Sequence, residues 1–367
     1  MSELRTATLE VDNDTAAVYE LSLAEKWGDG APVVPPTRER VLAMLAETPR
    51  DSAEIVAMLP PRRGGATVEL LAINAVMAGC TPRMFPLVIA AIEALAEPGY
   101  NGFALATTTA PVTPYLIVNG PTRDELQFDY RAGCLGGAAG RGSVSVGRAV
   151  ALCLRNIGGL RAGDTSRSVL GQPARFGMCF AEWEERSEWP SLALRRGFQP
   201  HQEVITVHGG MGIIPLVDVN TDDDRELAHL IAKTLAMPMT NLYVPPVHRR
   251  GEVIVVLNPM WAERFGASWP KVEDLQSYLH EHAWQPADVF PTRMRKLLGE
   301  RGRIDGRGRV HAATGPQQIV PIVAGGLGNL HSAILMTFGE TLMQSAAALR
   351  AGGPAKGGQA LLQRRAE

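Results

Sequence analysis

Short apolar runs rich in β-branched residues recur along the chain, and most of them stand beside a glycine-rich turn and a segment with helical spacing. Residues 115–120 (YLIVNG), 252–258 (EVIVVLN) and 319–326 (IVPIVAGG) have the composition of buried strands. The second run leads directly into a predicted helix, PMWAERFG. Strands that alternate with helices are typical of α/β proteins. The sequence therefore predicts an α/β fold in which Gly-rich strand–loop–helix units surround a mixed or parallel sheet.

Helical spacing and end signals predict several further helices. These cover residues 36–47, 67–78, 82–96, 143–157 and 331–350. Thr37 is the expected N-cap of the first, Gly79 ends the second, and Ser143 opens the fourth. Residues 203–219 (EVITVHGGMGIIPLVDV) contain two short β-rich runs about a pair of glycines, which predicts two short strands.

The order strand, glycine-rich loop and helix is predicted both for residues 115–154 and for residues 319–349. Either the chain holds two related halves, or both segments follow the general pattern of α/β proteins. On the first interpretation the chain is divided into four parts. These are an N-terminal extension (1–26), a first α/β half (27–200), a second α/β half (201–350) and a frayed polar tail (351–367).

Composition excludes several classes of function. The formal net charge of −2 and the pI near 6.5 lack the basic excess of nucleic-acid-binding proteins. No run approaches the roughly 20 apolar residues of a membrane span, and the first residues lack the layout of a signal peptide. Four cysteines are too few for a disulfide scaffold. We therefore expect a cytoplasmic homo-oligomer with reduced thiols and a small-molecule substrate, without nucleic-acid or membrane partners.

Cys80 stands in the segment INAVMAGC, where one predicted helix ends at Gly79 and the next begins after Pro82. At such a corner the N-terminal N–H groups of the second helix and the charge of Arg83 favour a thiolate. The corner is therefore a candidate nucleophile or metal ligand, and the alternative is a buried thiol that fills a joint between two helices. Asn74, on the preceding apolar helix, needs a partner if it is buried and is a candidate substrate-binding residue.

The segment 133–148 (GCLGGAAGRGSVSVGR) is the second candidate site. Its glycines and small hydroxyl residues precede a helix, so backbone N–H groups are available to hold a phosphate, a carboxylate or another oxyanion. Arg148 adds positive charge. The pattern lacks the Lys-Ser/Thr of a Walker loop and the spacing of a GxGxxG loop, so it predicts an anion pocket without naming a nucleotide. Gly136 and Gly137 are its candidate binding residues.

Acid–base candidates lie in three places. Glu182 stands among aromatic residues in RFGMCFAEWEER, and a carboxyl group in such surroundings has the raised pKa that general acid–base catalysis uses. The alternative is a solvated acidic loop. His208 and His331 each stand by a glycine-rich turn at a strand end, where ligand sites of α/β sheets gather. The further candidate substrate-binding residues at loops and strand ends are Thr107, Thr108, Asn119, Gly325 and Gly326.

A metal or iron–sulfur site formed by Cys80, Cys134 and Cys179 is an alternative. The irregular spacing of these cysteines does not indicate a zinc site, but residues far apart in sequence can converge in the fold. The cofactor prediction therefore stays open between none and a metal or iron–sulfur cluster.

Several motifs resemble a poorly characterised bacterial family related to proteins known for a UGSC motif, in which a selenocysteine or cysteine stands. The segments that carry the resemblance are WGDGAPVVPPTRERV, INAVMAGC, YLIVNGP, the glycine-rich stretch ending in VGRAV, GQPARFGMCFAEWEE and IVAGGLG with the following HS. They span residues 27–332, and WGDG and AGC are the most specific. This chain has no UGSC or CGSC string. The resemblance implies that Cys80 is the functional cysteine.

Three classes of function follow. The first is an oxidoreductase, lyase or hydrolase that uses Cys80 as nucleophile or redox thiol on a small polar or anionic metabolite, with the glycine-rich loop as anion pocket. The second is a lyase or hydratase that uses a metal or cluster held by Cys80, Cys134 and Cys179. The third is a binding or assembly subunit with inert cysteines.

Overall fold

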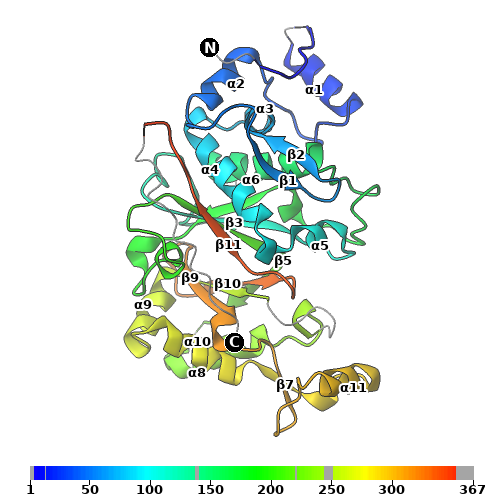
Figure 1. Cartoon of the computed structure of the whole chain (residues 1–367). Coiled ribbons are helices and arrows are strands. Elements are labelled where there is room, and N and C mark those ends of the chain that lie inside the picture. The colour runs from blue at the N-terminus through cyan, green and yellow to red at the C-terminus, as the bar shows by residue number, and fades with distance from the viewer. Residues whose placement is uncertain (1–3, 13, 137–139, 220, 244–250, 353–367) are drawn as a thin grey trace.

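The computed structural model describes residues 4–12, 14–136, 140–219, 221–243 and 251–352. Its centre is a seven-stranded mixed sheet against which helices pack (Figure 1), so the predicted α/β class is confirmed. The strand order is β4-β3-β5-β10-β6-β9, and β11 pairs with β5. The bounds are β3 (Thr113–Asn119), β4 (Met178–Ala181), β5 (Val204–Val217), β6 (Val253–Leu257), β9 (Ile319–Val323), β10 (His331–Thr337) and β11 (Gln344–Ala347).

The sheet has an internal two-fold pattern. β3 runs parallel to β4 and antiparallel to β5, while β6 runs parallel to β9 and antiparallel to β10. β5 and β10 pair with each other antiparallel at the centre. Helix α6 (Arg141–Asn156) lies between β3 and β4 in the chain, and helices α9 (Pro259–Ser268) and α10 (Val272–His282) lie between β6 and β9. The matching units are therefore residues 113–217 and 253–337, in place of the predicted pair 115–154 and 319–349.

The carboxyl ends of the two parallel pairs meet. The backbone N–H of Trp183, just after β4, donates to the carbonyl oxygen of Val323 at the end of β9 (2.7 Å). The loop around Asp129 and Tyr130 lies between the same ends, because its carbonyl groups accept from the N–H groups of Ala181 and Gly325. Polar residues that follow β3, β4 and β9 are thereby brought to one end of the sheet.

Helices cover the sheet on both halves. α4 (Phe85–Ala96) packs on β5 and β11, and α6 packs on β4; in the second half α10 packs on β9 and α9 on β6. A separate apolar cluster consists mainly of side chains from the strands, among them Ile117, Phe180, Ile254, Ile322 and Leu335. The remaining helices are α1 (Thr15–Ala24), α2 (Arg38–Leu45), α3 (Val68–Met77), α5 (Gly102–Thr107), α7 (Leu192–Arg195), α8 (Asp224–Leu235) and α11 (Thr292–Glu300). Two strand pairs lie outside the main sheet: β1 (Ile55–Leu59) with β2 (Gly64–Thr67), and β7 (Trp284–Pro286) with β8 (Arg309–His311).

Local helix signals agree with the structure at most ends. The Thr37 side chain accepts from the N–H of Arg40 and caps α2, and Gly79 (φ 87°) follows the end of α3. α6 differs, because it begins at Arg141 with Gly140 as N-cap. Ser143 lies inside its first turn, and its Oγ accepts the N–H of Asp129 (2.8 Å). The predicted opening of this helix by Ser143 is therefore wrong.

The prediction of a long helix over residues 331–350 is wrong. This segment forms β10 and β11, and it runs antiparallel along β5. Ala, Leu and Met are good helix formers, but intrinsic propensity contributes little free energy per residue, and pairing with β5 and β6 outweighs it. Residues 203–219 are also not two short strands, since β5 is continuous over Val204–Val217. Gly210 permits this, because a Cβ there would lie 2.4 Å from the Tyr115 ring.

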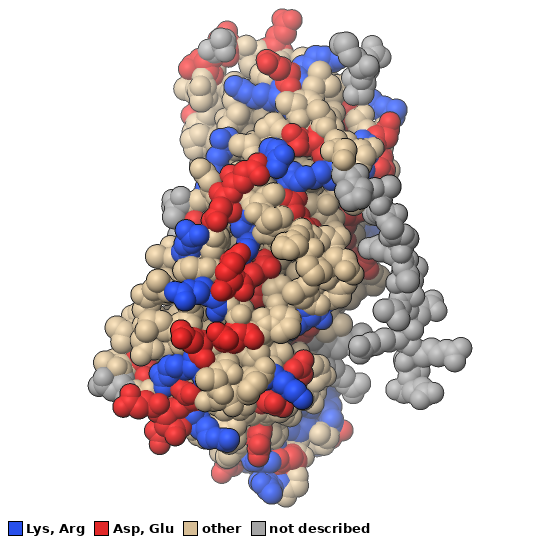
Figure 2. Space-filling model, turned by 90° about the vertical axis from the view of Figure 1, so that its left-hand side faces the viewer, with Lys and Arg blue, Asp and Glu red and all other residues tan. Residues whose placement is uncertain are grey.

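The remaining observations concern the surface charge, the character of the helices and the predicted boundaries of the parts. Acidic and basic side chains are interspersed over the face shown in Figure 2. Within the described ranges, no helix combines the length and the apolar character that crossing a membrane requires. Most of the predicted tail 351–367 lies outside the described residues, and the predicted boundary near residue 200 falls in the loop between α7 and β5.

Candidate functional site

A cavity of about 480 Å³ lies beside the first turns of α6. Four separate stretches of chain contribute to its wall: β3, the loop before α6 together with the first turns of that helix, residues 172–179, and the middle of β5. Its polar lining groups belong to Tyr115, Ser143, Arg148, Gln172 and Cys179, and apolar side chains such as Val144, Phe176, Met178 and Ile213 form much of the rest. Ligand sites in proteins commonly have this composition, a mostly apolar hollow with a few polar groups that fix orientation.

The long connection over residues 120–140 has no counterpart of similar length in the second half. In the second half Asn258 alone stands between β6 and α9, and its side chain caps α9 by accepting the N–H of Trp261. Connections of more than about 12–15 residues inside a compact domain are commonly functional. Gly136, one of the predicted binding residues, belongs to this connection and lines the cavity, while Gly137 lies outside the described residues.

The polar groups of the cavity are neutral or already paired. The Tyr115 hydroxyl donates to Gln172 Oε1 (2.5 Å), and the Gln172 amide donates to the carbonyl oxygen of Gly210 (3.0 Å). Arg148 holds Asp29 through two hydrogen bonds (2.7 and 2.8 Å) and also donates to the carbonyl oxygens of Ala31 and Pro32. The charge predicted to bind an anion is therefore neutralised by the WGDG segment.

Cys179 is the cysteine that lines the cavity. Burial raises the pKa of its thiol, and the Asp129 charge raises it further. Asp129 is itself unusual. Burial raises the pKa of its carboxyl group against hydrogen bonds from Gly140 and Ser143, and its Oδ2 has no hydrogen-bond partner.

Cys80 lies at the predicted corner between α3 and the turn that begins at Pro82, but it is buried in the apolar core. Burial raises the pKa of its thiol to about 12, although the Arg141 charge opposes this change. Arg141 donates instead to the carbonyl oxygen of Gly79. Because Cys80 also lies outside the lining of the cavity, this environment favours a packed joint over a nucleophile.

The three cysteines of the metal alternative fall into two groups. Cys80 and Cys179 belong to the core around α3, α4 and α6, whereas Cys134 belongs to the separate cluster with Tyr115 and Phe180. Over the part of the chain that the structure describes, no three His, Cys, Asp or Glu side chains are placed to hold one metal ion. The donor set that a cluster needs is therefore not assembled from these residues.

Glu182 and Asn119, two further predicted site residues, form a second polar centre at the joined strand ends. Asn119 Nδ2 and the N–H of Leu192 each donate to Glu182 Oε2 (2.7 Å). Burial raises the pKa of Glu182, although the Arg195 charge and both hydrogen bonds oppose it. The interpretation of Glu182 as part of a solvated acidic loop is therefore wrong, because its side chain is fully buried.

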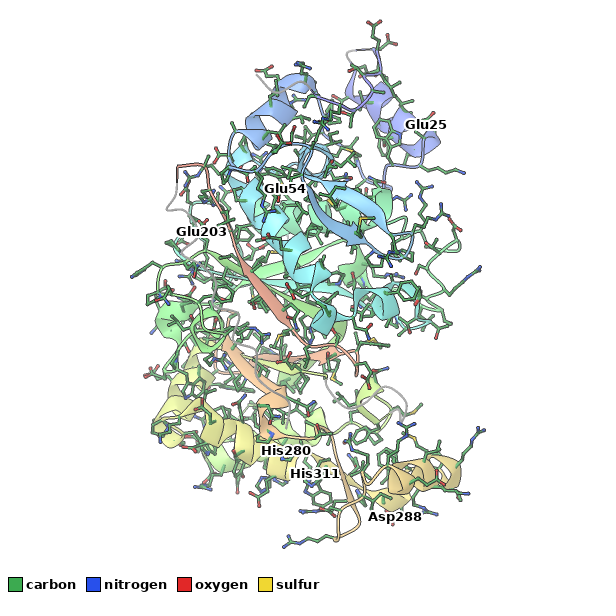
Figure 3. The ribbon with its side chains drawn as sticks, in the orientation of Figure 1. Glu25, Glu54, Glu203, His280, Asp288 and His311 are labelled. Carbon is green, nitrogen blue, oxygen red and sulfur yellow. The ribbon has the colours of Figure 1, made fainter. Side chains whose placement is uncertain are left out.

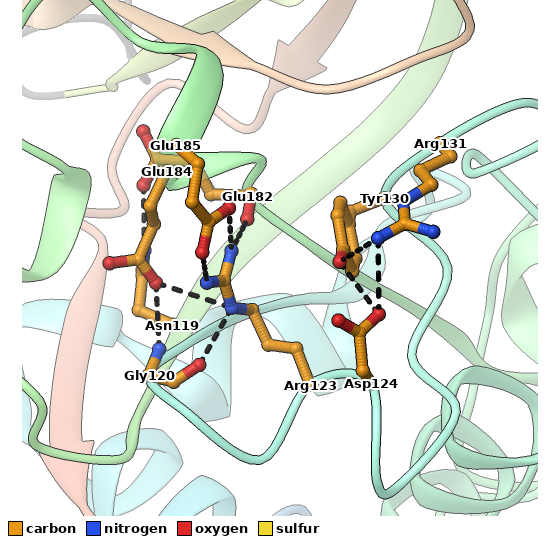
Figure 4. A network of polar contacts seen from close by, with 9 residues as sticks. All are labelled: Asn119, Gly120, Arg123, Asp124, Tyr130, Arg131, Glu182, Glu184 and Glu185. Atoms are coloured by element: carbon orange, nitrogen blue, oxygen red, sulfur yellow. Dashed lines mark hydrogen bonds and ion pairs between the residues drawn. The ribbon is translucent and has the colours of Figure 1, made fainter.

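Arg123 organises the loop beside Glu182. Its guanidinium group donates to the carbonyl oxygens of Gly120 and Glu182 and pairs with Glu184 and Glu185. Figure 4 shows these acidic residues gathered on one side of Arg123, with Asp124, Tyr130 and Arg131 on the other. A single arginine from the 120–140 connection thus pairs with two of the three glutamates in the run EWEER.

The two histidines lie apart from the cavity. His208 is buried within the sheet, and its Nε2–H donates to the carbonyl oxygen of Glu252 (2.8 Å). Burial lowers its pKa to about 4. His331 begins β10 with an exposed side chain, and its carbonyl oxygen accepts from Asn258. Neither side chain lines the cavity beside α6.

The remaining predicted residues have structural contacts. Asn74 accepts from Asn156, which also donates to the carbonyl oxygen of Trp27. Thr107 and Thr108 hydrogen-bond within the end of α5 and the following turn. Gly325 (φ 115°) and Gly326 approach the 120–140 connection, since Gly325 donates to Tyr130 and a Cβ on Gly326 would lie 3.3 Å from Ala132.

Sequence reasoning missed Tyr115, Gln172 and Asp29. Tyr115 lies in a run whose composition predicts only a buried strand, and Gln172 and Asp29 lie in segments that carry the family resemblance. The polar character of these residues was the available signal. Their partners stand far away in the sequence, so no local pattern predicts the contacts.

The scan against family models gives no match for this chain, and no curated protein resembles it significantly. The resemblance based on the motifs WGDG and AGC therefore stays a prediction. The fold and the cavity define a mixed α/β protein with a candidate small-molecule site, and the function has to be argued from that site.

Proposed function

We propose that the protein is an enzyme that binds a small organic molecule in the cavity beside α6, and that Cys179 is the thiol that meets this molecule. The observation that carries the proposal is the cavity itself, because it joins a cysteine, a hydroxyl group and an amide from distant segments in one hollow. Cys80, the cysteine expected from the sequence, lies outside its lining. The protein is thus still a thiol-dependent enzyme, as the sequence predicts, but its functional cysteine is Cys179 and not Cys80.

The substrate class follows from the lining. The Arg148 charge is already matched by Asp29, and Ser143 and the Tyr115–Gln172 pair offer uncharged hydrogen-bonding groups. Burying a charged ligand against such groups is costly. A small, largely apolar molecule with a carbonyl or hydroxyl group therefore suits the cavity better than the strongly anionic metabolite expected from the glycine-rich loop.

Proton transfer is the first chemical requirement. The Cys179 thiol rests in its protonated form, so it becomes a nucleophile only when its proton is removed. Asp129 is our candidate base, because one of its buried carboxylate oxygens is unpartnered and its loop lies against β4, where the Ala181 N–H donates to the Asp129 carbonyl oxygen (2.8 Å). The proton would pass from Sγ to the carboxylate as the sulfur adds to the carbonyl carbon of the substrate. The π electrons of the C=O bond would move to the carbonyl oxygen, which would then take the proton from Asp129.

The test begins with ligand binding. A panel of small ketones, amides, esters and hydroxy acids is screened for ligands that raise the melting temperature. Val144→Phe fills the cavity, since Val144 lines it and is 48% exposed. Val169→Phe is the matched control, because Val169 is 78% exposed and outside the lining. We expect binding to be lost only in Val144→Phe, and a ligand held equally by both variants argues against this cavity.

Turnover separates the enzyme from a binding subunit. A ligand found in the screen is incubated with the protein and followed by mass spectrometry. Turnover that disappears in Cys179→Ser and persists in Cys153→Ser supports the proposal, because Cys153 is fully buried in the last turn of α6 and lies outside the cavity lining. Binding without turnover favours the non-catalytic alternative, for which the burial of all four cysteines is the supporting observation.

A further inference from the structure

Four buried polar atoms around Glu182 have no hydrogen-bond partner within the protein. They are Glu182 Oε1, Asn119 Oδ1, Ser191 Oγ and Arg195 Nε. Ten such atoms occur among the described residues, so this small region holds a large share of them. Buried polar atoms are almost always partnered, and an unpartnered one costs about 1–3 kcal/mol. Their concentration at one place therefore points to a ligand that satisfies several of them together.

The residues that carry these atoms are tied to the Glu182 carboxyl group. Asn119 donates to it with its amide nitrogen, so the unpartnered oxygen of the same amide lies close by. Ser191 precedes Leu192, whose N–H donates to the same carboxyl group. The Arg195 charge acts on Glu182, and its Nη2 donates to the carbonyl oxygen of Pro321 in β9 (2.6 Å). The centre thus connects both halves of the sheet.

A cleft of about 290 Å³ lies on the outer side of this centre. Its lining includes Glu184, Trp189, Ser191 and His201. Ser191 therefore belongs to both places: the residue lines the cleft, its hydroxyl oxygen is buried, and the N–H of the next residue, Leu192, donates to Glu182. Glu182 and Asn119 are buried and do not line the cleft, whereas Ser191 does.

The chemistry of the four atoms selects the ligand. A carboxyl oxygen and an amide oxygen accept hydrogen bonds, an arginine Nε–H donates one, and a hydroxyl group does either. A water molecule has two donors and two acceptors, and buried waters have 2–4 such partners. We propose that these atoms form a binding site for one water molecule, and that this water and Ser191 pass protons between Glu182 and the cleft while the protein stays folded.

Hydrogen–deuterium exchange at the Glu182 carboxyl group tests the relay. The protein is transferred into heavy water at a pH where Glu182 is protonated. Infrared spectroscopy then follows the C=O stretching band of the Glu182 carboxyl group, which is identified as the band that is lost in Glu182→Gln. Ser191→Val removes the hydroxyl group and fills its space. Ser187→Val is the matched control in the same loop, because the Ser187 hydroxyl is already bonded to Trp189.

We expect the band to exchange at least tenfold more slowly in Ser191→Val than in the wild type and in Ser187→Val. Equal exchange in all three proteins would overturn the relay. A crystal structure checks the site itself: density for a water within about 2.7–3.2 Å of at least three of the four atoms supports it, and direct pairing of Glu182 Oε1 with Arg195 Nε overturns it. If Ser191→Val does not fold, Ser191→Ala takes its place, with the same expected slowing.

Discussion

Asp29 and Arg148 stand 119 positions apart and form a two-pronged ion pair, with Nη2–Oδ1 at 2.7 Å and Nε–Oδ2 at 2.8 Å. Both side chains are largely buried, with 14% and 11% of their surface exposed. Burial acts to raise the pKa of Asp29, but the hydrogen bonds and charge of Arg148 outweigh it and the pKa is lowered. This pair fixes the WGDG segment on α6, beside the cavity.

Removal of one partner should destabilise the protein strongly. Arg148→Met leaves the Asp29 carboxylate buried without its partner, for which we expect a loss of about 3 kcal/mol in the free energy of unfolding. The measurement is urea denaturation at pH 7. Arg62→Met is the control, because the Arg62–Asp164 pair is 58% and 54% exposed and should contribute less than about 1 kcal/mol. Equal losses in the two variants would contradict the assigned role.

Gly177 should not tolerate a side chain. Its φ is 135°, and a Cβ there would lie 2.4 Å from the backbone nitrogen of Arg148. We expect Gly177→Ala to lower the free energy of unfolding by at least about 1–3 kcal/mol. Gly171→Ala, with open space around its Cβ position, should be neutral or slightly stabilising. Thermal unfolding of the two variants decides the point, and a stable Gly177→Ala protein would show that residues 172–179 do not approach α6 so closely.

His208 should make the protein sensitive to acid. Burial lowers its pKa to about 4 in the folded state, against about 6.5 in the unfolded chain. Between these values the unfolded chain binds the proton and the folded protein does not, so stability falls as the pH falls below 6.5. At pH 4 the loss reaches about 3 kcal/mol. His208→Gln should flatten the dependence of the free energy of unfolding on pH in this window, whereas His331→Gln, at an exposed site, should leave it unchanged. Parallel curves for wild type and His208→Gln would refute the assignment.

The four thiols should react slowly with iodoacetamide at pH 7. Burial raises the pKa of Cys80 and of Cys134 to about 12 and raises those of Cys153 and Cys179 as well. We expect the alkylation rate of the native protein to keep rising up to pH 10, and Cys179 to react before the others because it lines the cavity. Peptide mass spectrometry identifies the modified residue. A single fast thiol at Cys80 that reaches its plateau near pH 7 would restore the expectation drawn from the sequence.

The second half contains a contact between two histidines, His280 and His311, that no sequence pattern suggests. His280 and His311 stack with ring centroids 5.1 Å apart (Figure 3), although they stand on α10 and β8. Burial and the His311 charge lower the pKa of His280. Their positions in the chain give no hint of this contact, because it depends on how the β7–β8 pair lies against α10.

Local signals in the sequence determined those features that depend on neighbours along the chain. Thr37 and Gly79 mark helix ends as expected, because a cap satisfies the backbone groups of its own helix turn. The strands at residues 253–257 and 319–323 are likewise recognisable from unbroken apolar runs. Glu182 and Asn119 could be chosen as polar residues at strand ends, where the fold class places ligand sites.

Tertiary structure decided what depends on distant partners. Residues 331–350 became two strands because β5 and β6 supply a pairing edge, which outweighs a weak local helix preference. Arg148 became a structural tie because Asp29 lies against α6, and Cys80 became a core residue because α4 and α6 enclose it. Burial and charge pairing are sums over contacts made across the fold, so the sequence names the reactive groups while their packing determines which of them meet a ligand.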